Sequence, residues 1–475
     1  MHSNLINGEW VGADQSRPNI NPSELSDVIG EYASSGRAHV DQAIEAAGAA
    51  QRGWAATNIE ERFAILDRAG NLILERREEI GRLLSREEGK ILAEGIAEVT
   101  RAGQTFKYVA GEALRCSGET LQSVRTGVEV NITREPVGIV GIITPWNFPA
   151  AIPAWKIAPA LAYGNTVVFK PADLVPGTAS ALVAILVEAG LPKGVVNLVM
   201  GPGSIVGQAI VDDPRTRAVS FTGSTRTGRA AAETCARLGK KVQLEMGGKN
   251  PLIVLNDADL DTAVNCALNG AFFATGQRCT ASSRLIVERE IRPRFEATLI
   301  ARIQALNVGH ALDPASQIGP VVDRRQFDSD LEYIELGRKE AGRVVGGEVL
   351  SRRTEGFYLQ PALFLETTND MRINREEIFG PMASIIEVAD YEEAESVAND
   401  TEYGLSSGIC TTSLKYAQRF RKTSQAGMVM VNLPTAGVDY HVPFGGRKNS
   451  SYGSREQGQY AIEFYTDVKT AYTAG

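Results

Sequence analysis

The strongest restriction on the fold comes from short apolar runs that alternate with turn residues and helical patterns. In a first series the runs cover residues 137–144, 166–169, 194–200, 218–221, 242–244 and 251–254. A second series extends from about residue 256 to 431, with runs at 283–287, 344–350 and 385–388. Buried strands that alternate with helices form parallel sheets covered on both faces. The sequence therefore predicts an α/β chain with two such units, divided at about residues 246–250.

Helical and extended patterns surround these units. Apolar residues recur at helical spacing over residues 40–56 and over the long stretch 59–114, where the charges at 75–79 predict a solvated helix face. Residues 118–136 instead alternate between apolar and polar side chains, as exposed strands do. We expect them to pair with the β-prone tail at 463–472, and a neighbouring subunit often covers strand edges of this type. The predicted assembly is a homodimer or homotetramer.

Composition and charge exclude several partners and sites. The 475 residues carry a formal net charge of -8, whereas nucleic-acid binding needs a basic face. The five cysteines form no CxxC pair and no secretory leader is evident, which favours a reducing, cytoplasmic compartment. The four histidines are not spaced as metal ligands, so we expect no metal. No apolar run approaches the roughly 20 residues of a membrane helix, so we expect no membrane span.

A candidate nucleophile lies in the stretch FFATGQRCTASSR at residues 272–284. Cys279 follows a Gly-Gln-Arg sequence there and precedes small polar residues. Helix-start amides or a positive charge lower the pKa of a thiol, whereas a structural cysteine has apolar surroundings. The neighbours of Cys279 fit the first description better. A single cysteine is nevertheless more often a small buried hydrophobe, so both roles stay open on this stretch alone.

Two turns at the ends of predicted strands have the residues of a dinucleotide site. The sequence FTGSTRTG at 221–228 follows a strand and opens a helix, where backbone N–H groups and the Ser224 hydroxyl can meet a phosphate. Lys170 and Asp173 stand at the end of another strand, where a ribose would be hydrogen-bonded. Such a turn needs glycine even without a ligand, and a surface Lys and Asp need no role, so each signal is weak alone.

An amide and a carboxylate end two further strands. Asn147, in TPWNFP at 144–149, can donate to a developing oxyanion or satisfy its own turn. Glu245, in LEMGGK at 244–249, is a carboxylate at an apolar strand end. Burial raises the pKa of such a group toward neutrality, which suits a general base; a paired structural glutamate is the alternative.

Six motifs in order, TPWNFP, FTGSTxxG, LEMGGKNP, GQRC, EEIFGP and PFGG, give the chain a resemblance to the aldehyde dehydrogenase superfamily. The resemblance covers essentially the whole chain. It implies that Cys279 is the nucleophile, Glu245 the general base, and Asn147 with the Cys279 N–H the oxyanion hole. The implied reaction is NAD(P)-dependent oxidation of an aldehyde to an acid through a thiohemiacetal and a thioester, with hydrolysis favoured over transfer to coenzyme A.

The fold implied by the resemblance is an aldehyde dehydrogenase-like α/β fold with three parts. A Rossmann-type dinucleotide-binding domain would comprise residues 1–117 and 137–248. An α/β catalytic domain would comprise residues 249–454. A β-ribbon for oligomerisation would comprise residues 118–136 and 455–475.

The resemblance also assigns cofactor contacts. Lys170 is similar to the family's adenosine-ribose lysine, Ser224 to its pyrophosphate contact, and Glu377 and Phe379 to its contacts with the nicotinamide ribose and ring. The full expected set is Thr144, Pro145, Trp146, Lys170, Ala172, Asp173, Gly203, Phe221, Gly223, Ser224, Glu377 and Phe379. Many NAD-preferring relatives have Glu where this chain has the shorter Asp173, and Arg226 adds a positive charge to the phosphate turn. Both features favour NADP, with NAD as the alternative.

The segment at 432–452 resembles the branch that oxidises α-ketoglutaric semialdehyde, and also a branch that acts on a pyridine succinoyl-semialdehyde. Succinic semialdehyde and a broad range of aldehydes are further alternatives for the small-molecule substrate. The expected pocket consists of Phe148, Trp155, Arg278, Thr280, Pro434 and Phe444. Arg278 can meet a substrate carboxylate or only pack against backbone carbonyls. Two other classes, a cysteine hydrolase using Cys279 with His441 and a silent binding protein, fit the motifs less well.

Overall fold

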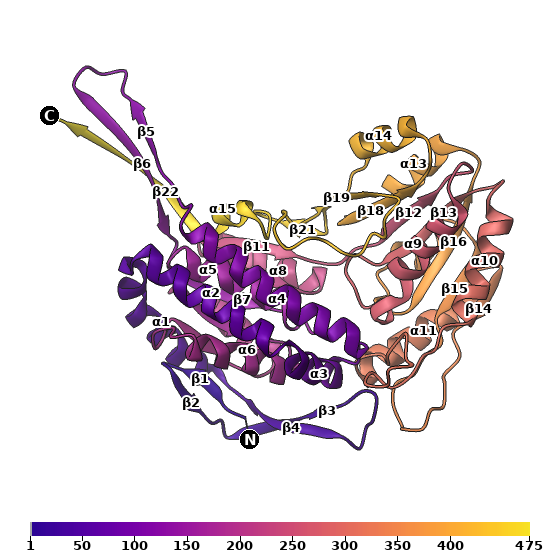
Figure 1. Ribbon diagram of the computed structural model, residues 1–475, viewed down its shortest axis with the longest axis horizontal. Helices are drawn as coiled ribbons and strands as arrows, with labels where there is room; N and C mark the ends of the chain where they lie inside the picture. Colours follow the sequence, from indigo (N-terminus) through magenta and orange to yellow (C-terminus); the bar gives the residue numbers. More distant parts are fainter. Residues whose placement is uncertain (1) are drawn as a thin grey trace.

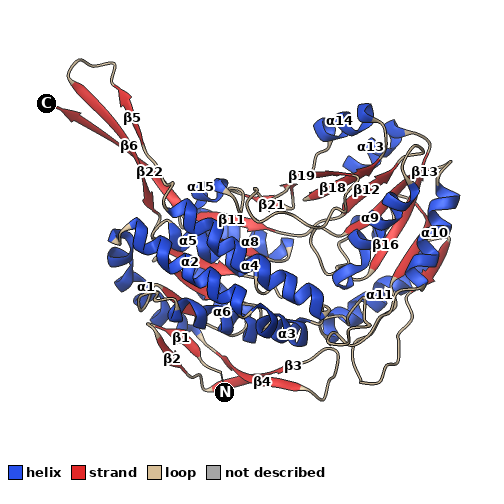
Figure 2. Cartoon of the chain, viewed as in Figure 1, coloured by secondary structure: helices blue, strands red, loops and turns tan. Residues whose placement is uncertain are grey.

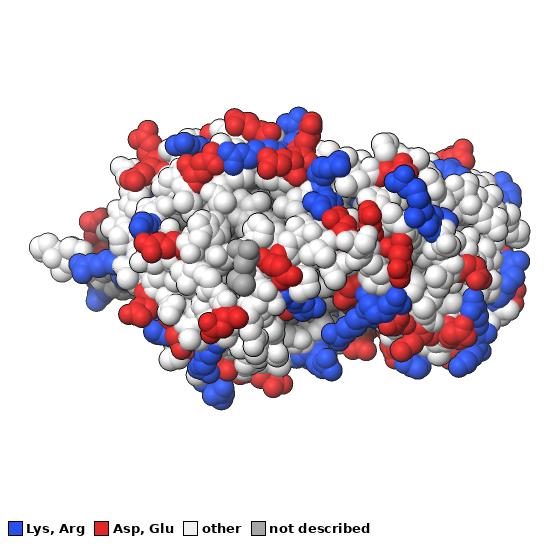
Figure 3. Space-filling model, turned by 90° about the horizontal axis from the view of Figure 1, so that it is seen from below, with Lys and Arg blue, Asp and Glu red and all other residues white. Residues whose placement is uncertain are grey.

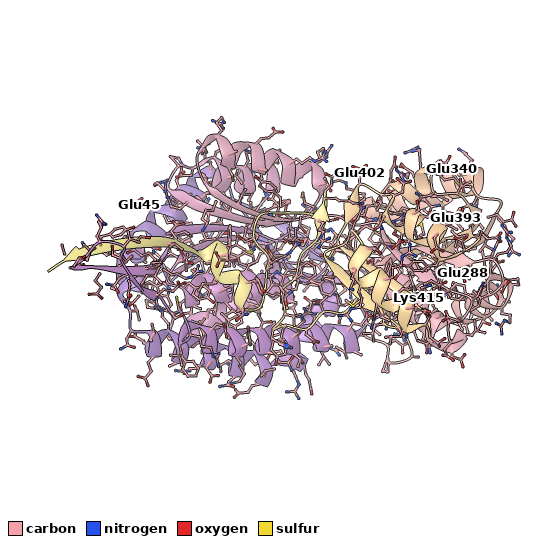
Figure 4. The ribbon with its side chains drawn as sticks, turned by 90° about the horizontal axis from the view of Figure 1, so that it is seen from above. Glu45, Glu288, Glu340, Glu393, Glu402 and Lys415 are labelled. Carbon is pink, nitrogen blue, oxygen red and sulfur yellow. The ribbon has the colours of Figure 1, made fainter. Side chains whose placement is uncertain are left out.

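The computed structural model describes residues 2–475, which form two α/β units and a projecting β-ribbon (Figure 1). The first unit contains an eight-stranded sheet and the second a seven-stranded sheet. Seen from above, Glu45 belongs to the first unit, and Glu340, Glu393 and Lys415 belong to the second (Figure 4). The predicted α/β class is confirmed, while the residue limits of the three domains stay predictions.

The first sheet is parallel in its centre and antiparallel at both edges. Its strands, in spatial order, are β2 (Glu9–Val11), β1 (Asn4–Ile6), β9 (Val196–Leu198), β8 (Thr166–Lys170), β7 (Ile139–Ile143), β10 (Thr216–Thr222), β11 (Lys241–Glu245) and β21 (Ser451–Tyr452). The five strands from β9 to β11 run parallel to one another. Strands β8 and β9 follow β7 on one side, whereas β10 and β11 lie on its other side. Ligands bind such sheets at this reversal, outside the carboxyl ends of the strands.

Helices cover both faces of this sheet, which explains the unbroken apolar runs of its strands (Figure 2). Val140 and Ile142 of β7 join the core formed with the helices at residues 59–75, 92–113 and 151–162, whereas Ile139 joins the core formed with the helices at 37–56 and 208–212. The helices of the unit are α1 (Arg37–Ala56), α2 (Ile59–Glu75), α3 (Arg77–Glu88), α4 (Leu92–Ala113), α5 (Ala151–Ala162), α6 (Pro176–Glu188), α7 (Gln208–Asp212) and α8 (Thr225–Arg237). The predicted helical region at 59–114 is thus three helices, and Gly89 ends α3 in the left-handed conformation (φ 97°).

The second sheet is parallel except at one edge. Its strands, in spatial order, are β14 (Arg343–Gly346), β15 (Ala362–Thr367), β16 (Met382–Val388), β13 (Ser282–Glu288), β12 (Asn250–Val254), β18 (Ser406–Cys410) and β19 (Met428–Val431). Its helices are α9 (Leu260–Phe272), α10 (Arg292–Gln304), α11 (Arg324–Glu340), α12 (Arg372–Arg375), α13 (Tyr391–Asn399) and α14 (Leu414–Thr423).

Three details differ from the sequence expectations. The run at 251–254, which we had assigned to the first series, pairs with β13 and β18 of the second sheet. The run at 344–350 ends at Gly346 (φ 76°) and forms the antiparallel edge strand β14. Residues Ser451–Tyr452 return to the first sheet beside β11, a pairing that the sequence pattern does not predict. The chain therefore crosses between the units more than once.

The ribbon joins distant parts of the chain. Strands β5 (Glu119–Gln122), β6 (Val128–Pro136) and β22 (Thr466–Ala474) form one antiparallel sheet, with β22 reached through α15 (Ile462–Tyr465). Every residue of β22 pairs with β6, so the predicted pairing of 118–136 with the C-terminal tail is confirmed. Two smaller two-stranded sheets consist of β3 (Gln15–Ile20) with β4 (Val28–Ser34), and β17 (Tyr403–Gly404) with β20 (Arg447–Lys448).

The surface shows no extended basic stripe on the face in Figure 3, where acidic and basic side chains are intermixed. Within residues 2–475, no helix combines the length and the apolar character needed to cross a membrane.

Candidate active site

The segment before Cys279 has an unusual backbone. After α9 ends at Phe272, three consecutive residues, Ala274, Thr275 and Gly276, have positive φ angles of 50°, 56° and 64°. A Cβ on Gly276 would lie 2.1 Å from the carbonyl oxygen of Gly380, so only glycine fits there. Left-handed backbone costs an L-residue free energy and persists where the surroundings enforce it, often at functional sites.

Hydrogen bonds from neighbouring segments fix the cysteine loop. Asn250 Nδ2 donates to the carbonyl oxygens of Cys279 (2.8 Å) and Ala281 (2.9 Å). Thr435 Oγ1 donates to the carbonyl oxygen of Thr280 (2.7 Å). These contacts hold the loop at residues 279–281 between β12 and the segment after β19.

Asn147 reaches the same loop from the first unit. It is 3% exposed, and its Nδ2 donates to the carbonyl oxygen of Gln277 at 3.0 Å. Lys90 donates to the Asn147 carbonyl oxygen (2.6 Å) and to Glu98 (2.7 Å). Glu98 also accepts from the backbone of Ala150 (2.8 Å), at the start of α5. A buried ion pair therefore positions the backbone on which the amide of Asn147 is carried.

The surroundings of Cys279 are apolar and acidic rather than basic. The half-buried side chain packs against the cluster of Leu405, Met428 and Phe444. Burial, then the charges of Glu377 and Glu245, raise the pKa of the Cys279 thiol well above its ordinary value. The backbone N–H groups of Cys279 and Thr280 lower this pKa, as we expect of neighbouring amides, but burial outweighs them, so the net lowering that the sequence predicts is not found.

Arg278 contributes little positive charge to the thiol because it is already paired. Its Nη2 lies 3.0 Å from Glu94 Oε1, which also accepts from the Ala274 backbone at 3.0 Å. Both members of this ion pair are largely buried. This contact counts against Arg278 as the partner of a substrate carboxylate.

Glu245 ends β11 and is buried, with 2% of its surface exposed. Its Oε2 accepts a hydrogen bond of 2.5 Å from Ser451 Oγ, the residue that pairs with it in the sheet. Burial, then the charge of Glu456, raise the pKa of the Glu245 carboxyl well above its ordinary value, while the bond from Ser451 lowers it. Glu456 is itself paired with buried Lys156, which donates to Ser220 at 2.8 Å. The apolar sequence of residues 151–162 does not indicate that Lys156 forms a buried ion pair with Glu456, so the sequence does not predict this pair.

The expected phosphate and ribose residues gather at the carboxyl ends of β7, β8 and β10. Ser224 caps α8 and accepts from the backbone of Thr227 (3.4 Å). A Cβ on Gly223 would lie 2.6 Å from the ring of Phe221, so glycine is required in this turn. Lys170 is buried, and its ammonium donates to Asp173 at 3.1 Å.

Two further features of this region suit a bound dinucleotide. Thr144 Oγ1, at the end of β7, is buried without a hydrogen-bond partner among residues 2–475. A groove beside β8 is lined by Arg17, Tyr32, Ala33, Ser34, Pro171, Ala172, Asp173, Pro176, Met200, Gly201 and Pro202. An unpaired donor at the end of β7 and a groove at the end of β8 fit the polar groups of a dinucleotide.

The residues expected at the nicotinamide end come from both units. Glu377 accepts from the backbone N–H of Gly248 (2.8 Å), and burial raises the pKa of its carboxyl to about 7. Phe379 has a positive φ of 66°, and its ring meets Trp146 edge-on at 5.3 Å. These contacts join the segment after α12 to the TPWNFP turn.

The expected substrate residues form an aromatic wall near the nucleophile. Trp155 of α5 stacks on Phe444 with 5.3 Å between ring centroids, and Phe148 packs in the same cluster as Trp155. Thr280 is buried, and its carbonyl oxygen accepts a hydrogen bond from Thr435, the residue after Pro434. Within residues 2–475, no cluster of three or more His, Cys, Asp or Glu side chains is arranged to hold a metal ion.

Comparisons with known proteins agree with this geometry. The model of the aldehyde dehydrogenase family matches residues 10–471 of the chain. An α-ketoglutaric semialdehyde dehydrogenase of Bacillus subtilis is 43% identical over 475 residues, covering 99% of this chain and 97% of the relative. A 2,5-dioxopentanoate dehydrogenase of Saccharolobus solfataricus is 41% identical, with 98% of each chain covered. A crystal structure of betaine aldehyde dehydrogenase from Staphylococcus aureus in complex with NAD+ superimposes with a TM-score of 0.97 at 34% identity, covering 100% of this chain and 95% of that one. The chain therefore belongs to the aldehyde dehydrogenase family.

Proposed function

We propose that the protein oxidises an aldehyde to a carboxylic acid with NAD or NADP, through a covalent intermediate on Cys279. One observation carries the proposal: Asn147 Nδ2 binds the carbonyl oxygen of Gln277 at 3.0 Å, which holds an amide donor two residues from the thiol. The charge of buried Glu245 is close enough to raise the pKa of that thiol. A donor, a nucleophile and a base are the groups that this reaction needs.

The residues supply the following steps. The thiolate of Cys279 forms a bond to the aldehyde carbon, and the oxyanion of the resulting thiohemiacetal accepts from Asn147 Nδ2 and the Cys279 N–H. A nicotinamide bound at this site would supply the hydride acceptor, and loss of the hydride from the thiohemiacetal carbon would leave a thioester on Cys279. Glu245 takes a proton from water, which attacks the thioester and releases the acid and the thiol. Glu245 suits this role because its raised pKa makes the carboxylate a stronger base.

The residues that would hold the dinucleotide follow the carboxyl ends of the first sheet. Lys170 and Thr144 would meet the ribose and its neighbours, and Ser224 with Gly223 would meet the phosphates at the start of α8. Glu377 and Phe379 would close the nicotinamide end from the second unit. The unpartnered Thr144 hydroxyl supports this assignment.

For the cofactor we propose a preference for NADP over NAD. Asp173 is one methylene shorter than Glu, and Arg17 lies 3.7 Å from its carboxylate, which reduces the repulsion of a 2′-phosphate. Arg226 adds a positive charge at the start of α8. A higher kcat/KM with NAD than with NADP would contradict this preference. Arg226→Ala should lower kcat/KM for NADP more than for NAD.

For the substrate we propose a semialdehyde with a second polar group, with α-ketoglutaric semialdehyde (2,5-dioxopentanoate) as the first candidate. This proposal is supported by three relatives that are 41–43% identical over nearly the whole chain and are named as dehydrogenases of this semialdehyde. Other relatives at similar identity include retinaldehyde and betaine aldehyde dehydrogenases, so the substrate panel must include uncharged and cationic aldehydes.

The deciding experiment crosses that panel with both nicotinamides and follows reduced-nicotinamide absorbance. The expected result is the highest kcat/KM with 2,5-dioxopentanoate, followed by succinic semialdehyde and the pyridine succinoyl-semialdehyde. Cys279→Ala is the matched control and should abolish the signal with every aldehyde. A wild-type enzyme that reduces no nicotinamide, but hydrolyses esters through Cys279, would favour a cysteine hydrolase. The His441 ring packs edge-on against Tyr108 and Tyr440, and this aromatic packing counts against His441 as the base of such a hydrolase.

We also propose that the protein is a cytoplasmic homodimer or homotetramer assembled through its ribbon. Val124, Val468 and Tyr472 of the ribbon segments are 104%, 58% and 62% exposed, and such an apolar edge favours burial by another subunit. Removal of residues 466–474 should reduce the mass measured by analytical ultracentrifugation. An unchanged mass would contradict assembly through the ribbon.

A further inference from the structure

One arginine near the reaction centre has no carboxylate partner. Arg101, on α4, places its guanidinium carbon 5.7 Å from the ring centroid of Trp155. Trp155 stacks on Phe444, which packs against Cys279. A cation thus lies next to the aromatic wall that borders the nucleophile.

Arg101 meets only a neutral group. Its Nη2 donates to Gln457 Oε1 at 3.2 Å, and among residues 2–475 no carboxylate oxygen lies within ion-pair distance of its guanidinium. Glu98, one turn away on α4, is committed to Lys90 and to the backbone at the start of α5. Burial lowers the pKa of Arg101, and the charges of Glu98 and Asp439 raise it.

Three hydrogen-bond donors in this cluster are buried and have no acceptor within the described residues 2–475. They are Arg101 Nε, Trp155 Nε1 and Gln457 Nε2. Unsatisfied buried donors cost free energy, and native proteins keep them rare. Gln457 also has a left-handed backbone, with φ 61°, which favours a functional role. The groups of Arg101, Trp155 and Gln457 that remain unpaired are hydrogen-bond donors, and one of them belongs to a cation. Such a cluster is complementary to an anion rich in oxygen atoms.

We propose that Arg101 binds the carboxylate of an acidic semialdehyde, with Trp155 and Gln457 as additional donors to the same oxygen-rich end. The aldehyde then points toward Cys279, and the methylenes lie along the Trp155 and Phe444 rings. This inference rests on the proposed aldehyde oxidation and makes it specific for short aldehydes with a terminal carboxylate. Arg101 thereby takes the carboxylate-binding role that the sequence suggests for Arg278, whose charge is neutralised by Glu94.

The test compares an acidic and an uncharged aldehyde of matched length, 2,5-dioxopentanoate and pentanal, at saturating NADP. Arg101→Leu should raise the KM for 2,5-dioxopentanoate about 30-fold, the scale of a lost charge-assisted contact, and change that for pentanal less than about 3-fold. Arg101→Lys should recover part of the loss because it restores the charge without the planar fork. Equal changes for both aldehydes in either variant would overturn the proposal.

Arg278→Leu is the matched control, because it removes another arginine close to Cys279. It should alter kcat for both aldehydes alike, since Glu94 and the cysteine loop are disturbed. A selective loss of the acidic substrate in Arg278→Leu but not in Arg101→Leu would assign the carboxylate to Arg278 and refute Arg101. If Arg101→Leu fails to fold, Arg101→Lys decides, with pentanal turnover reporting the integrity of the site.

The wild-type enzyme separates the two levels of the argument. Failure to oxidise any aldehyde would remove the proposed function itself. Oxidation of pentanal and 2,5-dioxopentanoate with equal kcat/KM, unaffected by Arg101→Leu, would leave that function intact and refute only the role of Arg101.

Discussion

Ser451 tunes the carboxylate that we propose as the general base, so its replacement makes a sharp prediction. Ser451 Oγ donates to Glu245 Oε2 at 2.5 Å, and this bond lowers a pKa that burial has raised. A hydrogen bond to a charged group contributes about 1.5–3 kcal/mol. Ser451→Ala therefore makes the ionised base less available by a factor of about ten or more, since 1.4 kcal/mol corresponds to tenfold. Thioester hydrolysis should slow by that factor at a fixed pH on the rising limb of the profile.

Rapid mixing separates this step from the earlier ones. The burst of reduced nicotinamide reports thioester formation, and where hydrolysis limits turnover the following steady rate reports hydrolysis. In Ser451→Ala the burst should persist, and the steady rate should recover at a higher pH than in the wild type. Ser451→Thr keeps the hydroxyl and serves as the control, whereas Glu245→Gln should remain slow at every pH. Identical pH profiles for Ser451→Ala and wild type, with Glu245→Gln inactive, would refute the tuning role of Ser451.

Three other outcomes follow from the geometry. Asn147→Ala should lower kcat about 100-fold or more with little change in KM, measured at saturating substrate, because an oxyanion donor acts mainly in the transition state. Gly276→Ala should reduce the free energy of unfolding in urea by about 3 kcal/mol or more, because its Cβ would lie 2.1 Å from the Gly380 carbonyl oxygen. Gly190→Ala, also left-handed but with open space around it, should cost about 1–2 kcal/mol. Alkylation of Cys279 by iodoacetamide in the enzyme without cofactor should accelerate about tenfold per pH unit over the neutral range, since only the thiolate reacts; a plateau near neutral pH would contradict a raised thiol pKa.

The parallel sheets were predictable because strands buried on both faces leave an unbroken apolar record. The runs at 137–144 and 166–169 correspond to β7 and β8, whose side chains alternate between two covered faces. Strand β18, with the sequence SSGIC, is not predicted from the sequence because small residues, two of them polar, dominate it, yet all five are buried. Short strands of that composition depend on the neighbours that cover them rather than on their own pattern.

The groups that support the site were harder to predict than the site itself. Lys90, Glu94, Glu98 and Arg101 lie in or beside α4, where charges among helical apolar residues usually indicate a solvated face. In the folded protein Lys90 and Glu98 are at most 5% exposed, because the TPWNFP turn and α5 cover them. Nothing local distinguishes these charges from exposed ones. Their burial depends on contacts between segments about 50 residues apart.

The wrong expectation for the Cys279 pKa has a structural cause. We expect a helix start or the adjacent Arg278 to favour the thiolate, but α9 ends before Cys279, and the first element after the cysteine, β13, is a strand. The charge of Arg278 goes to Glu94, and the charges nearest the thiol belong to Glu377 and Glu245. Burial and these two carboxylates, rather than Arg278, therefore set the direction of the Cys279 pKa shift.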